Sequence, residues 1–318
     1  MGALSEDATH TDRRTYLTGV ALLLVAAALW SLNGALIKLI EADGRGPGAI
    51  AIAFYRSLFA AIFLAPFAWR GLPTLAPRVQ STLRIRLPIR AAGLWCVVFF
   101  AGMTVCFVLA NTLTEAANAI ILQYTSTFWV FGLSPWLLKE RPRAGDLGVL
   151  GLAVVGIGII FTGNAAAGLS GLFIALASGL FFGLLTLMLR CLRDSDSAAV
   201  TFLNNSGSAF LVLPLALMVG SMALTQRELF LLVIMGVVQF GIPYYLYTMG
   251  IARVPAYQAA LITMAEPVLV PIWTYLAVGE TVPRPTIIGG GVIMAALAAF
   301  IRSAHRSYPP SDAARSTA

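Results

Sequence analysis

The stretch VPAYQAALITMAEPVLVPIWTYLAVGE, from Val254 to Glu280, decides the fold of this chain. It has the length and apolar character of a membrane-spanning helix, and it carries Glu266-Pro267 near its middle. Moving the sequence back by 140 positions, without a gap, lays this stretch over EAANAIILQYTSTFWVFGLSPWLLKE, which ends at Glu140. Apolar runs match under the same shift from about residue 91 to about residue 160, and Glu266 falls on Ser126. The chain therefore contains an internal repeat.

Composition places the chain in a lipid bilayer. Hydrophobic residues make up 59% of the sequence and charged residues only 11%, with a mean hydropathy of +0.85. Apolar runs of the ~20 residues that a spanning helix needs recur along almost the whole length, whereas the short alternating segments of a spanning barrel do not. The net charge of +7 lies in short loops, without the aromatic-interleaved basic domain that would indicate nucleic-acid binding.

Ten of these apolar runs are predicted to span the membrane as helices. Their approximate bounds are residues 16–38, 49–69, 91–111, 116–137, 146–163, 168–190, 199–220, 229–250, 254–277 and 285–302. Most connections are short, so consecutive helices are expected to be antiparallel neighbours. The predicted fold class is an all-α integral membrane protein, whose largest partner is the lipid bilayer itself.

The repeat divides the ten helices into two sets of five. The first set covers residues 16–163 and the second covers residues 168–302. Residues 1–15 and 303–318 are polar and are expected to be disordered tails. A cleaved signal peptide is the competing interpretation of the N-terminus, but the first apolar run is longer than a typical signal core and lacks a clear small-residue cleavage site.

The distribution of basic residues predicts the orientation. If the N-terminus is cytoplasmic, 16 of the 21 Lys and Arg residues fall in inside segments and 3 in outside segments. Such a bias strongly favours both termini inside, in the cell (inner) membrane. Because five spans per half is an odd number, the second half must then cross the membrane upside down relative to the first. Two inverted repeats are typical of alternating-access transporters, and a duplicated scaffold or membrane enzyme is the plainer alternative.

Several short motifs then carry a family resemblance. They are WSLNGALIK (Trp30–Lys38), FYR (Phe54–Arg56), Glu140-Arg141 and Glu280 at helix ends, and Glu266-Pro267. In this order and at repeat spacing, over about residues 16 to 302, the chain resembles the EamA-type transporters of the drug/metabolite transporter superfamily. The resemblance implies a fold of ten helices around a central cavity and the export of small metabolites such as amino acids.

Glu266 is the only acidic residue of the 14 in the sequence that lies in the middle of a predicted span. An ionised carboxylate there costs about 2.5–3.5 kcal/mol on insertion scales, so Glu266 should be protonated, paired or facing a water-filled cavity. A role in binding substrate or carrying a proton is the first interpretation. A structural bond to a neighbouring helix, beside a kink at Pro267, is the alternative.

Other basic and acidic residues are open to plainer interpretations. Arg56 is a candidate substrate ligand, but its long side chain could equally reach the membrane interface. Lys38 and Arg190 lie at helix ends and are typical of interface anchors. Glu140 and Glu280 end the fourth and ninth helices beside basic residues, so they are expected to hold loops by ion pairs.

Polar and aromatic side chains complete the candidate site. Polar groups at membrane depth avoid lipid, and therefore face either a cavity or another helix. Their concentration on the first, fourth, eighth and ninth predicted helices favours a cavity. The substrate-binding candidates are Trp30, Asn33, Arg56, Gln123, Gln239, Tyr244, Thr263 and Glu266.

No motif in the sequence supports another chemistry. The sequence has no P-loop, no glycine-rich dinucleotide turn and no metal-ligand cluster, so no cofactor or metal is expected. His10 and His305 are both terminal, which argues against a hydrolase site inside the membrane. The favoured function is a secondary transporter of small molecules, with an embedded enzyme, a channel and a scaffold as alternatives. The sequence leaves open whether the chain forms a homodimer.

Overall fold

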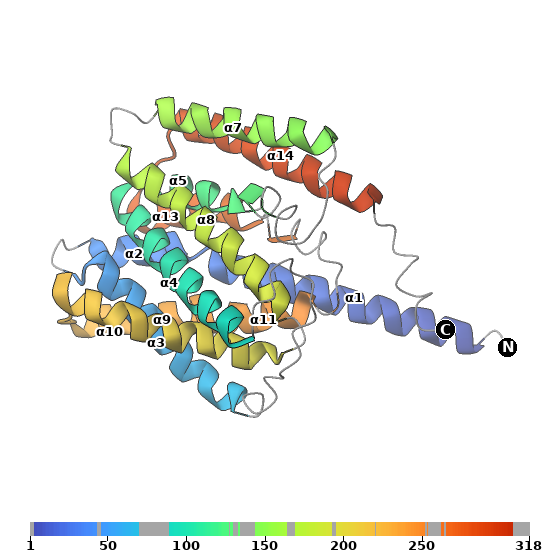
Figure 1. Cartoon of the computed structure of the whole chain (residues 1–318), viewed down its shortest axis with the longest axis horizontal. Coiled ribbons are helices and arrows are strands. Elements are labelled where there is room, and N and C mark those ends of the chain that lie inside the picture. Colours follow the sequence, from blue (N-terminus) through green and yellow to red (C-terminus); the bar gives the residue numbers. More distant parts are fainter. Residues whose placement is uncertain are drawn as a thin grey trace.

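The computed structural model describes most of the chain as a bundle of helices (Figure 1). The described residues are 3–42, 46–69, 89–126, 128–129, 133, 144–163, 169–192, 195–219, 221–251, 253, 262–263 and 265–307. Within these ranges every regular element is a helix, as the composition predicts.

The helices follow the predicted apolar runs. In the first half they are α1 (Ala3–Trp30), α2 (Asn33–Glu41), α3 (Ala49–Ala68), α4 (Ile89–Leu113), α5 (Ala116–Gln123) and α7 (Ala144–Gly163). In the second half they are α8 (Ser170–Cys191), α9 (Ser197–Val219), α10 (Gln226–Ile234), the π-helical segment η3 (Met235–Gly241), α11 (Ile242–Ile251), α13 (Ala265–Val278) and α14 (Arg284–Ser307). Several predicted spans are thus built from two or three shorter pieces.

Six helical stretches are long and apolar enough to cross a bilayer. They are Thr15–Glu41, Ala49–Ala68, Ala92–Leu113, Ser170–Leu189, Ser197–Val219 and Gln226–Tyr247. Two shorter apolar helices, Val154–Gly163 and Ala265–Val278, fall within two more predicted spans. The chain is therefore a multi-pass membrane protein, and the number of ten spans stays a prediction.

The first and last helices extend beyond the first and last predicted spans. The first helix begins at Ala3, because the residues before the apolar run include good helix formers and acidic residues that suit a helix N-terminus. The last helix continues to Ser307, and residues 308–318 lie outside the described residues. In Figure 1, α1 begins and α14 ends at the same end of the bundle, while α2 ends and α14 begins at the opposite end, which we call the distal end.

Helices of the two halves pack against one another in an exchanged pattern. In three pairs, each helix packs against its own repeat counterpart: α3 on α9, α7 on α14 and α5 on α13. The remaining pairs swap partners, because α1 packs on α11 and α4 packs on α8. The packing pattern is therefore the same when the two halves are exchanged. This is the pattern expected of two related halves arranged about a common axis.

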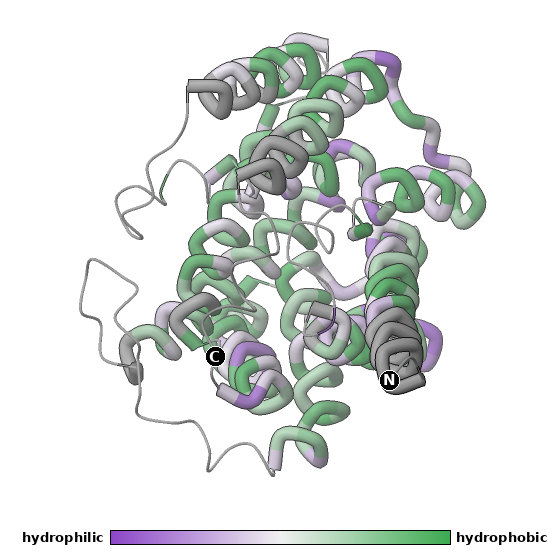
Figure 2. The backbone as a smooth tube through the Cα atoms, turned by 90° about the vertical axis from the view of Figure 1, so that its right-hand side faces the viewer, coloured by the Kyte–Doolittle hydropathy of each residue, from purple (hydrophilic) through white to green (hydrophobic). Residues whose placement is uncertain are grey.

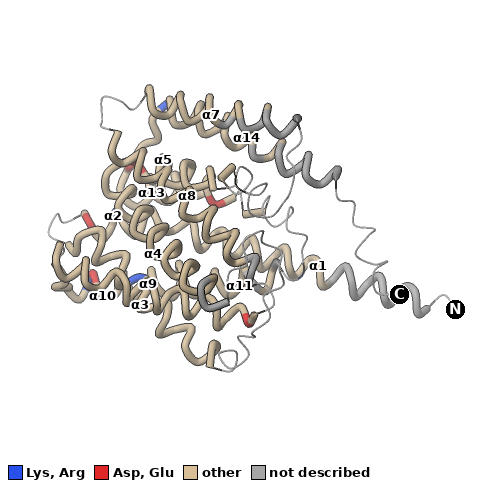
Figure 3. The backbone as a smooth tube through the Cα atoms, in the orientation of Figure 1, with Lys and Arg blue, Asp and Glu red and all other residues tan. Residues whose placement is uncertain are grey.

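The surface of the bundle suits lipid. Figure 2 shows hydrophobic colour along most of the helical tube, and Figure 3 shows few charged residues along the helices. Large apolar side chains are exposed on the outside of several helices, for example Phe210 at 78% and Met218 at 84%. In water such a surface would be unfavourable, so these faces mark contact with acyl chains.

Candidate functional site

Four irregular points in the helices lie at or beside several of the candidate residues. They are the turn at Ser31–Leu32 between α1 and α2, the end of α5 at Gln123, the start of α13 at Ala265, and the π-helical segment η3. Interrupted helices free backbone groups and redirect side chains, and they are tolerated at membrane depth only inside protein or beside a cavity. The irregular points therefore indicate the position of the functional site in the bundle.

The turn between α1 and α2 is held by Ser31. Its hydroxyl donates to the Ala28 carbonyl oxygen at 2.7 Å and accepts from the indole Nε1 of Trp273 at 2.9 Å. A serine hydroxyl bonded back to the preceding turn bends a helix. Leu32 keeps a helical backbone, with φ −70° and ψ −9°, so the axis is kinked while the chain still spans as one unit. Asn33 is thereby the first residue of α2.

The start of α13 explains the position of Glu266. Pro267 lies in the first turn, where its missing N–H costs nothing because the first N–H groups of a helix have no partner within the helix. Glu266 lies beside it in the same turn, where the positive end of the helix dipole favours an acidic side chain. The structure thus places Glu266 and Pro267 in the first turn of α13, while Met264 and residues 254–261 of the predicted span lie outside the described residues.

Glu266 is buried, with 8% of its surface exposed, and it joins three elements. Asn33 Nδ2 of α2 donates to Glu266 Oε1 at 3.2 Å, and the Tyr124 hydroxyl at the end of α5 donates to Glu266 Oε2 at 3.1 Å. The same hydroxyl also contacts the Thr263 carbonyl oxygen at 2.8 Å. Both halves of the repeat therefore meet at one carboxyl group.

An aromatic wall lies beside this carboxyl. The Trp30 ring contacts the rings of Tyr244 and Tyr247, each with a centroid separation of 5.1 Å. Gln239 Nε2, in η3, donates to the Trp30 carbonyl oxygen at 3.2 Å, an acceptor beside the turn that follows. Among the described residues, Gln239 Oε1 has no hydrogen-bond partner.

Arg56 is buried in the middle of α3 and does not reach the interface. Only 2% of its surface is exposed, and its guanidinium carbon lies 4.2 Å from the centroid of the Phe240 ring. Its charge lies within electrostatic range of Glu266 and Tyr244. In the part of the chain that is described, Arg56 Nε has no hydrogen-bond acceptor. Gly236 lets η3 approach closely, since a Cβ there would lie 2.9 Å from the Arg56 carbonyl oxygen.

The candidate residues do not all gather at one place. Asn33 and Glu266 are joined by a hydrogen bond, and the backbone of Thr263 lies at the same tyrosine hydroxyl. Trp30, Gln239 and Tyr244 form a second set of contacts, which the turn at Ser31–Leu32 places next to Asn33. Gln123 instead donates to Ser178 Oγ of α8 at 2.9 Å, and Ser178 donates to the Met103 carbonyl oxygen at 3.2 Å. For Gln123 the alternative of a bond between helices fits better than a place in the cavity.

Tyr124 is the main residue that the sequence analysis did not single out. It follows Gln123 and lies two positions before Ser126, the repeat counterpart of Glu266. Its place in the repeat could have indicated a contact with the Glu266 region. Nothing local in the sequence marks Tyr247 or Trp273, because aromatic residues are frequent in membrane helices.

Two of the charged residues at helix ends form an ion pair. Lys38 and Glu280, expected to be an interface anchor and a loop-holding acid, form an ion pair of 3.1 Å between Nζ and Oε2. Glu140 and the side chain of Arg190 lie outside the described residues.

Comparison with known proteins identifies the family of the chain. The EamA-like transporter family matches it twice, at residues 17–162 and 169–302. An uncharacterized transporter of Archaeoglobus fulgidus is 25% identical over 278 residues, which cover 87% of this chain and 94% of that protein. The uncharacterized transporter YwfM of Bacillus subtilis is 27% identical over 233 residues, covering 69% of this chain and 77% of that protein.

The fold has a counterpart among solved crystal structures. One of them aligns with a TM-score of 0.62 at 19% identity, over 92% of this chain and 98% of that one. This likeness concerns the fold alone, whereas the two family matches together span nearly all of the helical bundle. The chain belongs to the EamA-like transporter family, and it is a membrane transporter.

Proposed function

We propose that this protein exports small zwitterionic metabolites, such as amino acids, across the cytoplasmic (inner) membrane by alternating access. Ten spans in two inverted repeats of five, with both termini in the cytoplasm, are part of this proposal. The observation that carries it is the meeting of helix interruptions from both repeats at Glu266. In transporters built from repeats, substrate sites lie between the repeats, at broken helices near the middle of the membrane.

The chemistry around Glu266 supports a zwitterionic substrate. Arg56 offers a buried guanidinium with a free Nε, and a guanidinium binds a carboxylate through two parallel hydrogen bonds. Glu266 and the faces of Trp30 and Tyr244 offer the opposite end, since a carboxylate and aromatic faces both attract an ammonium group. An apolar or aromatic side chain of the substrate would contact the same rings.

The Glu266 carboxyl would also couple export of the substrate to entry of a proton. In the proposed cycle, Glu266 accepts a proton from the outside after substrate has left, and releases it to the cytoplasm when the next substrate binds. One proton then enters for each substrate molecule exported. Asn33 and Tyr124 hold the carboxyl in place, because each donates to a different oxygen of Glu266.

Counterflow in proteoliposomes tests the transport proposal. Purified full-length protein is reconstituted with a high internal concentration of one amino acid, and the entry of the same labelled amino acid is followed over a panel of substrates. A carrier gives a transient, saturable accumulation of label for some members of the panel. Entry that does not saturate would indicate a channel, and a chemically altered label would indicate an enzyme; either result overturns the proposal.

A further inference from the structure

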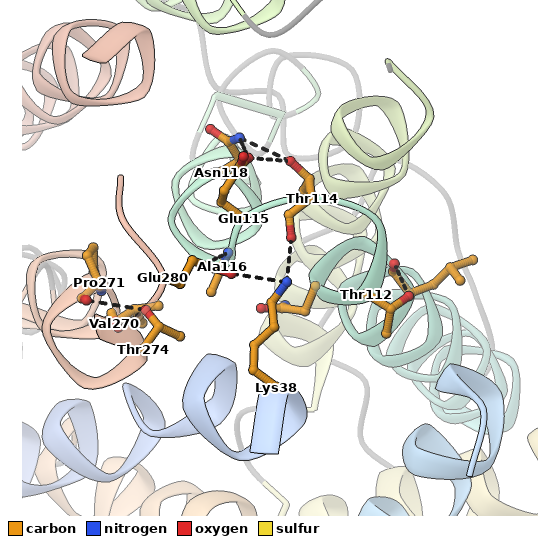
Figure 4. Close-up of polar contacts among 12 residues, drawn as sticks. Lys38, Thr112, Thr114, Glu115, Ala116, Asn118, Val270, Pro271, Thr274 and Glu280 are labelled. Carbon is orange, nitrogen blue, oxygen red and sulfur yellow. Dashed lines mark hydrogen bonds and ion pairs between the residues drawn. The ribbon is translucent and has the colours of Figure 1, made fainter. Parts of the chain in front are cut away.

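A polar cluster at the distal end joins the two repeats a second time (Figure 4). Lys38 Nζ, near the end of α2, pairs with Glu280 Oε2 at 3.1 Å and also donates to the Thr114 carbonyl oxygen at 3.1 Å. Glu280 Oε1 accepts from the backbone N–H of Ala116 at 2.8 Å. One carboxylate of the second repeat is thus bound to two separate elements of the first. We call Lys38, Thr114, Ala116 and Glu280 the distal cluster.

Local backbone geometry puts Glu280 in this position. Helix α13 ends at Val278, and Gly279 turns the chain with a φ of +71° while its N–H donates to the Tyr275 carbonyl oxygen at 2.9 Å. A left-handed glycine after the last helical residue is a common helix end. Ala116 is the first residue of α5, so its N–H is one of those that the helix itself leaves unpaired. The Glu280 carboxylate caps a helix that belongs to the other repeat.

Three helices connect the distal cluster to the central site. Helix α2 runs from Asn33 towards Lys38, and α5 runs from Ala116 to the cap residue Tyr124. Helix α13 carries Glu266 in its first turn, and Glu280 follows its last turn. Each helix therefore contributes one group to the Glu266 contacts and one group to the distal cluster. If the distal ends of these helices separated, the contacts of Glu266 with Asn33 and Tyr124 would change as well.

These helices also pack tightly between the two clusters. A Cβ added to Gly34 would lie 2.6 Å from Ala116 Cβ and 3.3 Å from side-chain carbons of Val270 and Thr274. All three helices thus meet at one glycine, on the distal side of Asn33. Ala116, Val270 and Thr274 are buried there. In this conformation, a substrate at Glu266 cannot leave between α2, α5 and α13.

A pocket of about 530 Å³ lies at the distal cluster, on the far side of this closure from Glu266. It is lined by Lys38, Thr112, Leu113, Thr114, Glu115, Gly279, Glu280 and Thr281. The pocket is wide open to the surface of the protein, as a vestibule must be. The ion pair that borders the pocket is partly exposed, at 20% for Lys38 and 17% for Glu280, so water screens it and it breaks easily.

We propose that the distal cluster is the gate through which substrate leaves the central site, and that the pocket beyond it is the exit vestibule. Lys38 and Glu280 are positioning residues of this gate: their pairing closes the distal ends of α2, α5 and α13, and its rupture lets α13 move away. The proposal rests on alternating access as proposed above. An ion pair that only stabilises the fold would stay formed throughout the transport cycle.

Cross-linking tests whether the cluster must open. In a background whose three natural cysteines are replaced by serine, Lys38→Cys and Glu280→Cys are combined and joined in proteoliposomes by a short bifunctional methanethiosulfonate reagent, which spans the gap left by the two longer side chains and is released by reduction. Because a locked gate prevents the conformational step, we expect counterflow to fall at least about tenfold, and to recover on reduction. Each single-cysteine variant should show the same flux before and after the treatment, whatever that flux is. Unchanged counterflow in the cross-linked protein would overturn the gate.

A second measurement needs no known substrate. With Asn33→Cys as the only cysteine, the rate of reaction with a charged thiol reagent is measured from the distal side. Lys38→Met and Glu280→Gln should each raise that rate several-fold, because both remove the charge pair; Glu280→Gln also keeps an oxygen for the Ala116 N–H. If the thiol reacted at the same rate with and without these substitutions in well-folded protein, the ion pair would have only a structural role. If the protein moves no amino acid at all but these rates rise, the gate stands and the proposed substrate class fails.

Discussion

Asn33 Nδ2 and Glu266 Oε1 lie 3.2 Å apart, although 233 positions separate the two residues in the sequence. Asn33 begins α2 and Glu266 lies in the first turn of α13, so the contact joins two helix starts from different repeats. Asn33 Oδ1 has no hydrogen-bond partner in the described ranges. The amide therefore holds the carboxyl with one atom and leaves the other available to a ligand.

Removal of the Tyr124 hydroxyl should weaken transport. In Tyr124→Phe, the Glu266 carboxyl loses one of its two side-chain donors, and loss of a hydrogen bond to a charged group costs about 1.5–3 kcal/mol. We expect flux to fall about tenfold or more, since 1.4 kcal/mol corresponds to a factor of ten.

Tyr55→Phe is the matched control for Tyr124→Phe. The Tyr55 hydroxyl donates to the Met222 carbonyl oxygen at 2.9 Å, away from the Glu266 contacts. Equal thermal destabilisation of both variants with equal flux would mean that Tyr124 serves stability alone.

Arg56 should select substrates that carry a carboxylate. Arg56→Gln removes the charge at a buried position while it keeps hydrogen-bonding groups, so the ratio of flux for an amino acid to flux for its amide should fall. Arg56→Lys should restore the charge but not the planar pair of donors, and should give an intermediate ratio.

The exposed Arg253 provides a comparison for Arg56. Arg253→Gln changes an arginine on the surface, where its Nη1 bonds to the Met249 carbonyl oxygen. The ratio of acid flux to amide flux should not change in this variant. A constant ratio in Arg56→Gln as well would remove Arg56 from substrate binding.

Gly279→Ala should strain the backbone without any clash. Gly279 has a φ of +71°, and a Cβ there would meet nothing within 4 Å, so the whole effect comes from the left-handed backbone conformation. We expect a loss of about 1–2 kcal/mol in stability, measured as a lower unfolding temperature in detergent. An unchanged unfolding temperature would show that this turn relaxes freely.

Labelling from the two sides of the membrane tests the orientation. Arg253 and Thr281 are both exposed and precede and follow the ninth predicted span. A cysteine introduced by Arg253→Cys should react only from the cytoplasmic side, and one introduced by Thr281→Cys only from outside. The reverse pattern would invert the predicted topology, and with it the direction assigned to the distal gate.

Much of this architecture was predictable from the sequence. The lengths of the apolar runs match the thickness of a bilayer, and the basic residues in the loops indicate the orientation of the helices. Glu266 stood out since a lone acid at membrane depth needs an explanation. The turn at Ser31–Leu32 lies in the aromatic-Ser-Asn motif of the family resemblance, which implies a turn in the first helix. Physical reasoning from the sequence alone does not explain it, because the Trp273 contact that supports it comes from 242 positions away. The pairing of Lys38 with Glu280 depends equally on helix packing, as does the contact of Gln123 with Ser178. Such contacts become visible only once the helices are placed.

The pH response of Glu266→Gln tests the account most directly. Glutamine keeps the size of the side chain and one oxygen for the Asn33 amide, and its NH2 group can donate to the Tyr124 hydroxyl, which still donates to the Thr263 carbonyl oxygen. It cannot release a proton. We predict that proteoliposomes with this variant retain counterflow yet lose the accumulation of substrate that a pH gradient drives. Asp196→Asn is the control, since asparagine can replace Asp196 as the acceptor for the Ala199 N–H at the start of α9. If Glu266→Gln accumulated substrate as the natural protein does under the same gradient, Glu266 would not be the coupling residue.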